Sequence, residues 1–286
     1  MKNAFWYPLL LLLFFAGDRF GGYVLEHQAG QSQFRFARLY RGDARAEILL
    51  LGNSRGLTFY QPYIEQITGK TTFNLSYNGL PMDVAKALVL DYLDRYPSPK
   101  NLLIDITTCD RENDNLLTGF SSFSGKSARL DVLIKEKARK AWWGGKVSAL
   151  FRFNNEIFQR TLFYRNKPDT DWLLDRVIQN DLATQVAKHS YDLEINPYLV
   201  QQLKETVEAA KAKGVNVTLL IGPYFPGFVV KNMADLKSAV EKATGLPVHD
   251  YRDALNDAAD FGDFMHPNKK GSVAYMDLLD RDGFFD

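Results

Sequence analysis

The chain has little of what builds disulfide-bonded, zinc-binding or nucleic-acid-binding proteins. Among its 286 residues there is one cysteine, Cys109, which excludes an internal disulfide framework and a cysteine zinc cluster. Its 35 lysines and arginines are balanced by 34 aspartates and glutamates, and no long run carries charge of one sign. Because nucleic-acid binding needs a basic patch or stripe, we expect no nucleic-acid partner. The charge balance suits a neutral or weakly charged substrate.

The N-terminus lacks a hydrophobic run of full membrane-spanning length. Lys2 precedes an apolar stretch of fourteen residues, 4–17, which ends at a charged pair that begins with Asp18. Fourteen residues suit the core of a signal peptide better than a span, which needs about 20 residues. However, Phe14 and Phe20 stand where a cleavage site would require small residues.

Three interpretations of this segment stay open: an uncleaved anchor that continues through Phe20 to Leu25, a cleaved signal peptide, and a buried helix of a soluble protein. We expect an anchor over residues 1–25 and a polar stalk over 26–46. Lys2 on the near side predicts that the rest of the protein is exported.

From residue 47 onward, short apolar runs alternate with amphipathic stretches. The apolar runs predict strands over residues 48–51, 71–75, 102–106, 215–221 and 247–250. The amphipathic stretches predict helices over residues 57–67, 82–93, 197–213, 234–244 and 270–279. This alternation indicates a three-layer α/β/α fold with a mostly parallel, flavodoxin-like sheet.

Residues 111–190 do not follow this alternation of predicted strands and helices. They are rich in aromatic residues, among them Trp142, Trp143 and Trp172, and contain no clear strand. We expect a helical insertion, 111–190, within a domain that covers residues 47–286. The tryptophans either stack on sugar rings or, as is commoner for aromatics at helical spacing, pack in a core.

Two segments far apart in the chain carry the candidate chemistry. Ser54 follows the first predicted strand, and Asp263 stands three residues before His266. A serine hydroxyl becomes a nucleophile when a base takes its proton, and a histidine is an effective base when a carboxylate orients its ring. Since parallel strands end at one edge of the sheet, where ligands gather, we expect these side chains to meet there.

Each of these residues also has a structural interpretation. Ser54 alone would be a turn or helix-cap residue, and Asp263 with His266 would be a turn before the last helix. His249, on a predicted core strand, and His189, in the insertion, are weaker candidates for the base.

The segments together resemble the SGNH (GDSL-like) hydrolase superfamily. The resemblance rests on Gly52-Asn53-Ser54 after the first strand, Asn78-Gly79 after the second, and Asp263-Phe264-Met265-His266 near the C-terminus. An N-terminal anchor followed by a Gly-x-Ser-Arg turn is similar to the membrane-anchored bacterial branch, which includes enzymes of polysaccharide O-acetylation. The resemblance covers residues 47–280 in outline, without the insertion.

The resemblance implies that Ser54 is the nucleophile, His266 the general base and Asp263 its orienting partner. It also implies that the backbone amides of Ser54 and Gly79 form an oxyanion hole.

Members of the superfamily usually add an asparagine donor in a Gly-x-Asn-Asp motif after the third strand, where this chain has Thr107-Thr108-Cys109-Asp110. Cysteine is a poor donor, so we expect Asn78 or Asn53 to compensate, or the enzyme to be slow.

Two residues beside the nucleophile are candidates for substrate binding, Arg55 and Asn53. Arg55 would bind an anionic substrate or, alternatively, form an ion pair that holds the turn. Asp105, inside the third strand, would face the substrate or a polar partner in the core.

We therefore expect a serine esterase or O-acyltransferase that acts, through an acyl-serine, on acetyl or other acyl esters of a cell-surface or exported polysaccharide. Water as the second acceptor makes an esterase and a sugar hydroxyl makes a transferase, and the motifs do not separate the two. No metal or organic cofactor is expected.

The expected partners are an acylated polysaccharide or acyl donor, the membrane through the N-terminal segment, and polysaccharide-export proteins. The expected location is the bacterial inner membrane, with a single-pass anchor and the catalytic domain in the periplasm. The alternatives are a catalytically inactive SGNH fold that binds polysaccharide or assembles an export complex, and a lipid-directed esterase.

Overall fold

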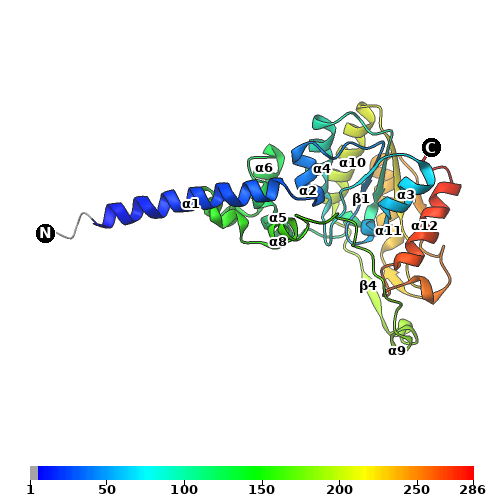
Figure 1. Cartoon of the computed structure of the whole chain (residues 1–286). Helices are drawn as coiled ribbons and strands as arrows, with labels where there is room; N and C mark the ends of the chain where they lie inside the picture. The colour runs from blue at the N-terminus through cyan, green and yellow to red at the C-terminus, as the bar shows by residue number, and fades with distance from the viewer. Residues whose placement is uncertain (1–5) are drawn as a thin grey trace. The chain divides into compact units, whose positions relative to one another are not determined.

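The computed structural model describes residues 6–286, and their contacts divide the chain into two compact units. The smaller unit combines the N-terminal residues through Asp43 with Asp114–Asp169. The larger unit combines Ala44–Asn113 with Thr170–Asp286. Figure 1 traces the chain through both units, which are described separately below.

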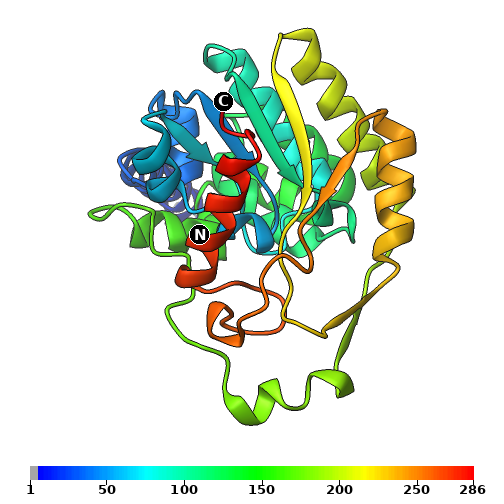
Figure 2. The same cartoon turned by 90° about the vertical axis from the view of Figure 1, so that its right-hand side faces the viewer.

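The larger unit is built on a five-stranded sheet in which every ladder is parallel (Figure 2). Its strands are β1 (Ile48–Leu51), β2 (Thr72–Asn74), β3 (Asn101–Asp105), β5 (Asn216–Ile221) and β7 (Val248–Asp250). They lie in the order β2-β1-β3-β5-β7, which is the flavodoxin-like order 2-1-3-4-5 when the strands of this sheet are counted along the chain. The predicted α/β fold with a parallel sheet between helices is confirmed.

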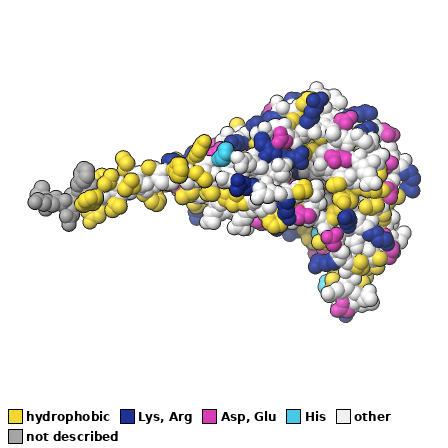
Figure 3. Space-filling view, in the orientation of Figure 1, with side chains coloured by type: hydrophobic (Ala, Val, Ile, Leu, Met, Phe, Trp, Pro, Cys, Tyr) yellow, Lys and Arg dark blue, Asp and Glu magenta, His cyan; other side chains and the backbone are white. Residues whose placement is uncertain are grey.

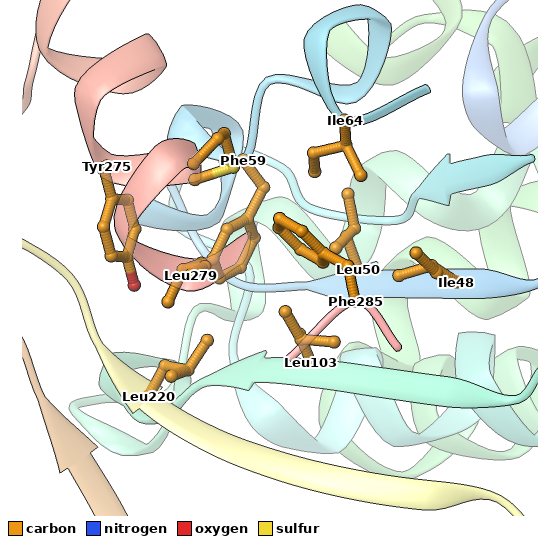
Figure 4. Packing of buried hydrophobic residues seen from close by; sticks show 10 residues of the cluster. Ile48, Leu50, Phe59, Ile64, Leu103, Leu220, Tyr275, Leu279 and Phe285 are labelled. Carbon is orange, nitrogen blue, oxygen red and sulfur yellow. The ribbon is translucent and has the colours of Figure 1, made fainter. Parts of the chain in front are cut away.

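One face of the sheet packs against α3 (Gln61–Thr68) and α12 (Lys269–Arg281). Alternate strand residues, Ile48, Leu50 and Leu103 among them, point to this face (Figure 4). The fully buried cluster that they form comprises Ile48, Leu50, Phe59, Ile64, Leu103, Leu220, Tyr275, Met276, Leu279 and Phe285.

The opposite face carries α4 (Met82–Arg95), α10 (Pro197–Ala212) and α11 (Met233–Thr244), which pack on one another and on β5 and β7. Because helices cover both faces, every residue of β1 and β3 is buried. This explains why both strands contain continuous apolar runs instead of an alternating pattern.

One predicted helix begins later than expected. The interval 57–67 was expected to be a single helix, but residues Arg55–Thr58 form a 3₁₀ helix, η1, and α3 begins at Gln61. Pro62 lies in the first turn of α3, where its missing N–H costs no hydrogen bond. The end of α3 at Gly69, which has a left-handed backbone, agrees with the sequence.

Short elements complete the larger unit. Strand β4 (Ser190–Asp192) pairs in parallel with β6 (Val229–Lys231), a two-stranded sheet that the sequence did not indicate. The remaining elements are η2 (Ile106–Cys109), α9 (Asn180–Ala183), η5 (Val186–Lys188) and η6 (Ala258–Asp260).

All regular elements of the smaller unit, over its described residues, are helical. They are α1 (Trp6–Gly30), α2 (Arg35–Arg41), α5 (Asp114–Gly119), η3 (Phe120–Phe123), α6 (Ala128–Lys137), α7 (Arg139–Val147), η4 (Leu150–Phe153) and α8 (Glu156–Phe163). Helix α1 is long and apolar enough to cross a membrane, as a signal sequence or a single anchor would be. The charged pair that begins at Asp18 does not interrupt it.

The segment expected to be a polar stalk, residues 26–46, contains the end of α1 and all of α2. Phe36 and Leu39 of α2 are fully buried, and the ring of Phe36 packs against Phe120 with 4.9 Å between centroids. Aromatic residues that look scattered in the sequence therefore form part of a helical core. The boundaries of the anchor, the stalk and the catalytic domain stay predictions.

Candidate active site

The turn after β1 presents Ser54 at the carboxyl edge of the sheet. It requires glycine at position 52, because a Cβ there would lie 2.5 Å from the Cα of Gly56 as the chain folds back into η1. Ser54 stands at the N-cap position of η1, but its side chain makes no capping hydrogen bond. The Ser54 hydroxyl is therefore available for another partner, and the helix-cap interpretation does not apply.

His266 lies at the tip of a loop that closes on its own backbone. The Asn268 N–H donates to the Asp260 carbonyl at 2.8 Å, and the Gly262 N–H donates to the His266 carbonyl at 3.0 Å. Asn268 also caps α12, because its side-chain oxygen accepts from the Gly271 N–H at 3.1 Å. This pairing fixes the loop immediately before the helix.

The structure brings Ser54, His266 and Asp263 into one chain of hydrogen bonds. Ser54 Oγ lies 2.9 Å from His266 Nε2, and His266 Nδ1 lies 2.9 Å and 3.1 Å from the two carboxylate oxygens of Asp263. An ionised carboxylate only accepts hydrogen bonds, so Nδ1 carries the proton and Nε2 accepts from the Ser54 hydroxyl. In this tautomer the imidazole can take the proton of Ser54.

The surroundings of Asp263 favour its ionised form. Partial burial works against the charge, but hydrogen bonds from the His266 ring and from the N–H groups of Met265 and His266 outweigh it and hold the Asp263 pKa below its usual value. The carboxylate therefore stays charged at neutral pH and can stabilise an imidazolium on His266.

Two cavities open on either side of Ser54. The larger, of about 380 Å³, is lined by Asn53, Ser54, Arg55, Gly79, Leu80, Thr107, Thr108, Asp110, Arg111, Glu112, Asn113, Tyr191, Leu193, Tyr224 and Met265. The smaller, of about 190 Å³, is lined by Ser54, Leu57, Thr58, Asn78, Trp172, Leu173, Leu174, Asp263, His266 and Pro267. The hydroxyl of Ser54 thus stands between two spaces that can hold two parts of a substrate.

Two backbone N–H groups beside the larger cavity can act as donors to an oxyanion. Among residues 6–286, neither the Ser54 nor the Gly79 N–H has an acceptor. Gly79 has a φ of +66°, a left-handed conformation that glycine adopts without strain. Asn78, its neighbour, lines the smaller cavity instead.

Sequence reasoning missed Asn113. Its side-chain amide donates to the Gly79 carbonyl at 3.1 Å and lines the larger cavity. The bond restrains the loop that carries Gly79. Nothing in the local sequence indicated this residue, because its partner lies 34 positions earlier in the chain.

Cys109, at the position where the resemblance implies an asparagine donor, is fully buried and lines neither cavity. Its thiol points to the Leu199 carbonyl, with 3.6 Å between sulfur and oxygen. Burial raises the pKa of the thiol to about 12. Thr107 and Thr108 of the same stretch line the larger cavity.

Of the two roles expected for Arg55, the structure shows the structural ion pair. The side chain is buried and lies 3.8 Å from the Asp105 carboxylate, and it donates to the carbonyls of Pro223, at 2.8 Å, and Met265. Its guanidinium also stacks 3.6 Å from the ring centroid of Tyr224. Arg55 therefore links the ends of β1, β3 and β5 to the His266 loop. Arg55 also lines the larger cavity, so its expected contact with substrate stays a prediction.

Asn53 is likewise engaged in the turn. Its amide donates to the Thr107 carbonyl at 2.9 Å, and its side-chain oxygen accepts from the Arg55 N–H at 2.9 Å. Asn53 still lines the larger cavity, so its expected contact with substrate stays a prediction. Asp105 faces Arg55 and accepts from the N–H groups of Thr107 and Gly222, which is the polar-partner alternative.

The other candidate histidines lie elsewhere in the larger unit. The His249 ring packs edge-on against Phe284, at 4.6 Å between centroids, and the His189 ring lies 5.2 Å from that of Phe264. Trp172 lines the smaller cavity and packs edge-on against Tyr77, whereas Trp142 and Trp143 belong to the smaller unit.

Over residues 6–286, no group of three or more His, Cys, Asp or Glu side chains is arranged to hold a metal ion.

The comparisons with known proteins add little to this geometry. No protein-family model matches the chain, and no curated protein matches it. The chain is similar to a solved structure from Bacteroides fragilis NCTC 9343 described as "a putative acylhydrolase". The two share 13% identity over 85% of this chain and 86% of that one, with a TM-score of 0.41.

Replacing Arg55 tests whether it holds the site together. We expect Arg55→Met to lower the free energy of unfolding by about 3–5 kcal/mol, because Asp105 would be left buried without its cationic partner. Arg55→Lys, which keeps the charge but loses the planar guanidinium, should lower the free energy of unfolding by a smaller amount. Urea unfolding of the protein in detergent measures both. Arg281→Met, at an exposed arginine, is the control and should change stability by about 0.5 kcal/mol or less. Equal effects of Arg55→Met and Arg281→Met would contradict the assigned role.

The buried thiol gives a second prediction. At pH 8 a thiol with a pKa of about 12 is thiolate in only about one molecule in 10⁴, and the thiolate is the reactive form. We expect iodoacetamide to leave Cys109 unmodified in the native protein and to add one carbamidomethyl group in urea, as intact mass will show. Native labelling at the rate of a free thiol would place Cys109 at the surface instead.

Proposed function

We propose that this chain is a serine esterase or O-acyltransferase that forms an acyl-enzyme on Ser54. The observation that carries the proposal is the hydrogen-bonded chain from Ser54 Oγ through the His266 ring to the Asp263 carboxylate, with 2.9 Å at each step. This arrangement beside two cavities provides a nucleophile, a base and an orienting carboxylate.

The reaction follows from these positions. Ser54 Oγ attacks the carbonyl carbon of an ester while His266 Nε2 takes its proton, and the negative charge that develops on the carbonyl oxygen is met by the N–H groups of Ser54 and Gly79. The bond to the alcohol oxygen then breaks, and the imidazolium returns the proton to that oxygen. Water or a second alcohol attacks the acyl-serine by the same steps in reverse order.

The need for proton transfer indicates which cavity would hold the alcohol part of the substrate and which the acyl part. His266 must reach both the departing and the incoming alcohol oxygen, so the alcohol part of the substrate belongs in the smaller cavity, which His266 lines. Trp172 lines the same cavity and offers an aromatic surface for a sugar ring. The acyl group then belongs in the larger cavity beside Gly79.

The charged residues in the lining of the larger cavity support a short acyl group. Asp110, Arg111 and Glu112 line it, and burying a long hydrocarbon chain against charged and polar groups would desolvate them without replacing their hydrogen bonds. An acetyl group avoids this cost, so we propose acetyl esters as substrates.

The proposed location rests on α1. We propose that this helix is an uncleaved anchor in a bacterial inner membrane, with Lys2 on the cytoplasmic side and the rest of the protein in the periplasm. A periplasmic enzyme with a site for a sugar acceptor suits a cell-surface or exported polysaccharide. Export proteins would then be its partners.

One observation favours a second candidate, a catalytically inactive protein that binds polysaccharide or assembles an export complex. Cys109 occupies the position of the third oxyanion donor, and it is buried away from the cavities. Loss of one such donor typically lowers turnover by about 100- to 1000-fold.

A fluorophosphonate probe distinguishes a slow enzyme from an inactive protein. We expect the full chain in detergent to be labelled on Ser54, as peptide mass spectrometry will show, and Ser54→Ala to abolish labelling. His266→Ala and Asp263→Asn should lower turnover of p-nitrophenyl acetate by about four orders of magnitude, since each removes part of the proton relay. Ser190→Ala, at an exposed serine of β4, is the control and should retain full activity. Absence of labelling in the folded native chain would favour the inactive protein.

The length of the acyl chain tests the substrate. We expect kcat/KM to be highest for p-nitrophenyl acetate and to fall for octanoate and palmitate esters, because charged residues line the larger cavity. Adding an oligosaccharide acceptor should divert acetyl from water to sugar if the protein is a transferase, as mass spectrometry of the sugar will show. A preference for palmitate would instead indicate a lipid-directed esterase.

A further inference from the structure

The α7–η4 segment of the smaller unit exposes apolar side chains that a water-facing surface would not favour. Helix α7 buries none of its residues. Trp143 and Val147 are 54% and 64% exposed, and Leu150 and Phe151, which follow at once, are 42% and 48% exposed. A helix on the surface of a soluble protein normally buries its apolar stripe, so a cluster of this kind marks an interaction surface.

This segment is fixed to α1 by the two charged residues in that helix. The Asp18 carboxylate, itself buried, accepts from the Ala149 N–H at 2.7 Å, the Leu150 N–H at 3.2 Å and the Ser148 hydroxyl. Arg19 donates to the Val147 carbonyl at 3.2 Å. These bonds connect α1 to the start of η4.

The contact is also close. A Cβ at position 22 would lie 2.5 Å from the Cβ of Ala149, so glycine there lets the two backbones approach. The level at which α7–η4 meets α1, residues 18–22, is therefore defined by the packing.

That level lies within the apolar, exposed length of α1. Figure 3 shows apolar side chains around this helix, and the exposed large ones extend from Trp6 to Val24. Nineteen helical residues span about 28 Å, which is close to the roughly 30 Å of a bilayer's hydrocarbon core. Residues 18–22 lie in the last third of this length, so a bilayer crossed by α1 would reach the level of α7–η4.

The charges near α7 fit the headgroup layer of such a bilayer. Lys135, Arg139, Lys140 and Lys146 are exposed, and the ammonium groups of Lys135 and Lys146 lie 5.4 Å and 5.1 Å from the ring centroid of Trp142. The acidic groups of the neighbouring α6 are Asp131, which pairs with Lys146 at 3.5 Å, and Glu136. Tryptophan with lysine and arginine is the combination found at membrane–water boundaries.

We propose that α7–η4 is a membrane-interface element that lies in the headgroup region around α1. Trp143, Val147, Leu150 and Phe151 enter the boundary of the outer leaflet, and the basic residues contact the phosphates of anionic lipids. This inference rests on the proposed retention of α1 as an anchor, and it is independent of the proposed catalysis.

Depth-dependent fluorescence quenching tests the proposal on the full chain reconstituted in phosphatidylcholine–phosphatidylglycerol vesicles. The chain has four tryptophans, so two single-tryptophan variants can be made by changing the others to phenylalanine. One keeps Trp143 and the other keeps Trp6, which lies in α1. We expect lipids brominated near the headgroup to quench Trp143 more than lipids brominated at the chain end. Aqueous acrylamide should quench Trp143 less in vesicles than in the urea-unfolded chain.

The Trp6 variant separates the two possible failures. Quenching of Trp6 by brominated lipid without quenching of Trp143 would overturn the interface proposal and leave the anchor in place, with a protein partner as the remaining occupant of the surface. Lack of quenching at both positions would overturn the anchor as well. Neither outcome affects the fluorophosphonate test of Ser54.

A charge variant tests the preference for anionic lipid. Arg139→Gln with Lys140→Gln should remove most of the extra Trp143 quenching that phosphatidylglycerol produces over phosphatidylcholine alone. Lys188→Gln with Lys211→Gln, which makes the same change in net charge in the larger unit, is the matched control and should leave that difference in place. Equal quenching in neutral and anionic vesicles for the native chain would contradict the lipid preference.

Discussion

The candidate site depends on one hydrogen bond, from the Ser54 hydroxyl to the His266 ring, between residues 212 positions apart. The two residues meet because both lie at the carboxyl edge of the parallel sheet. β1 delivers Ser54 through a turn tight enough to require glycine at position 52, while the His266 loop returns to the same edge immediately before α12. Arg55 joins these parts, because its buried guanidinium bonds both to the strand ends and to the carbonyl of Met265. An ion pair inside the fold thus links the strand ends to the loop that carries His266.

The same edge carries both cavities. Ser54 lines both and His266 lines only the smaller one, so in the proposed reaction the alcohol occupies the smaller cavity and the acyl group occupies the larger one, beside Gly79. The side-chain amide of Asn113 restrains the loop that carries Gly79 by donating a hydrogen bond to the Gly79 carbonyl. In the proposed mechanism it would support the oxyanion hole without itself donating to the oxyanion. Cys109 stands where the resemblance to the SGNH pattern implies an asparagine donor, but it is buried away from the cavities, so the proposed mechanism relies on the N–H groups of Ser54 and Gly79.

Much of this arrangement follows from the sequence, and the exceptions share a physical cause. The strands of the main sheet lie within about two residues of their predicted positions, because buried parallel strands leave continuous apolar runs. Ser54 and His266 were expected together because both follow elements that end at one sheet edge. The role of Arg55 could not be decided between substrate and ion pair, since its partners Asp105 and Met265 come from distant segments. The burial of α2 was missed for the same reason: its aromatic partners, such as Phe120, lie about eighty positions away.

The charged pair in α1 shows how tertiary contacts change the meaning of a sequence pattern. In the sequence, Asp18 and Arg19 end an apolar run and make it look too short for a span. In the structure Asp18 is buried and its charge is met by two N–H groups and a hydroxyl from the segment around Ala149, so the helix continues to Gly30 without an unpaired carboxylate. A charge that is expensive alone in a membrane is tolerated when protein groups satisfy it. The residues that interrupt the apolar run in the sequence are thus the same ones that attach the segment around Ala149, and with it α7 and its exposed Trp143, to the helix.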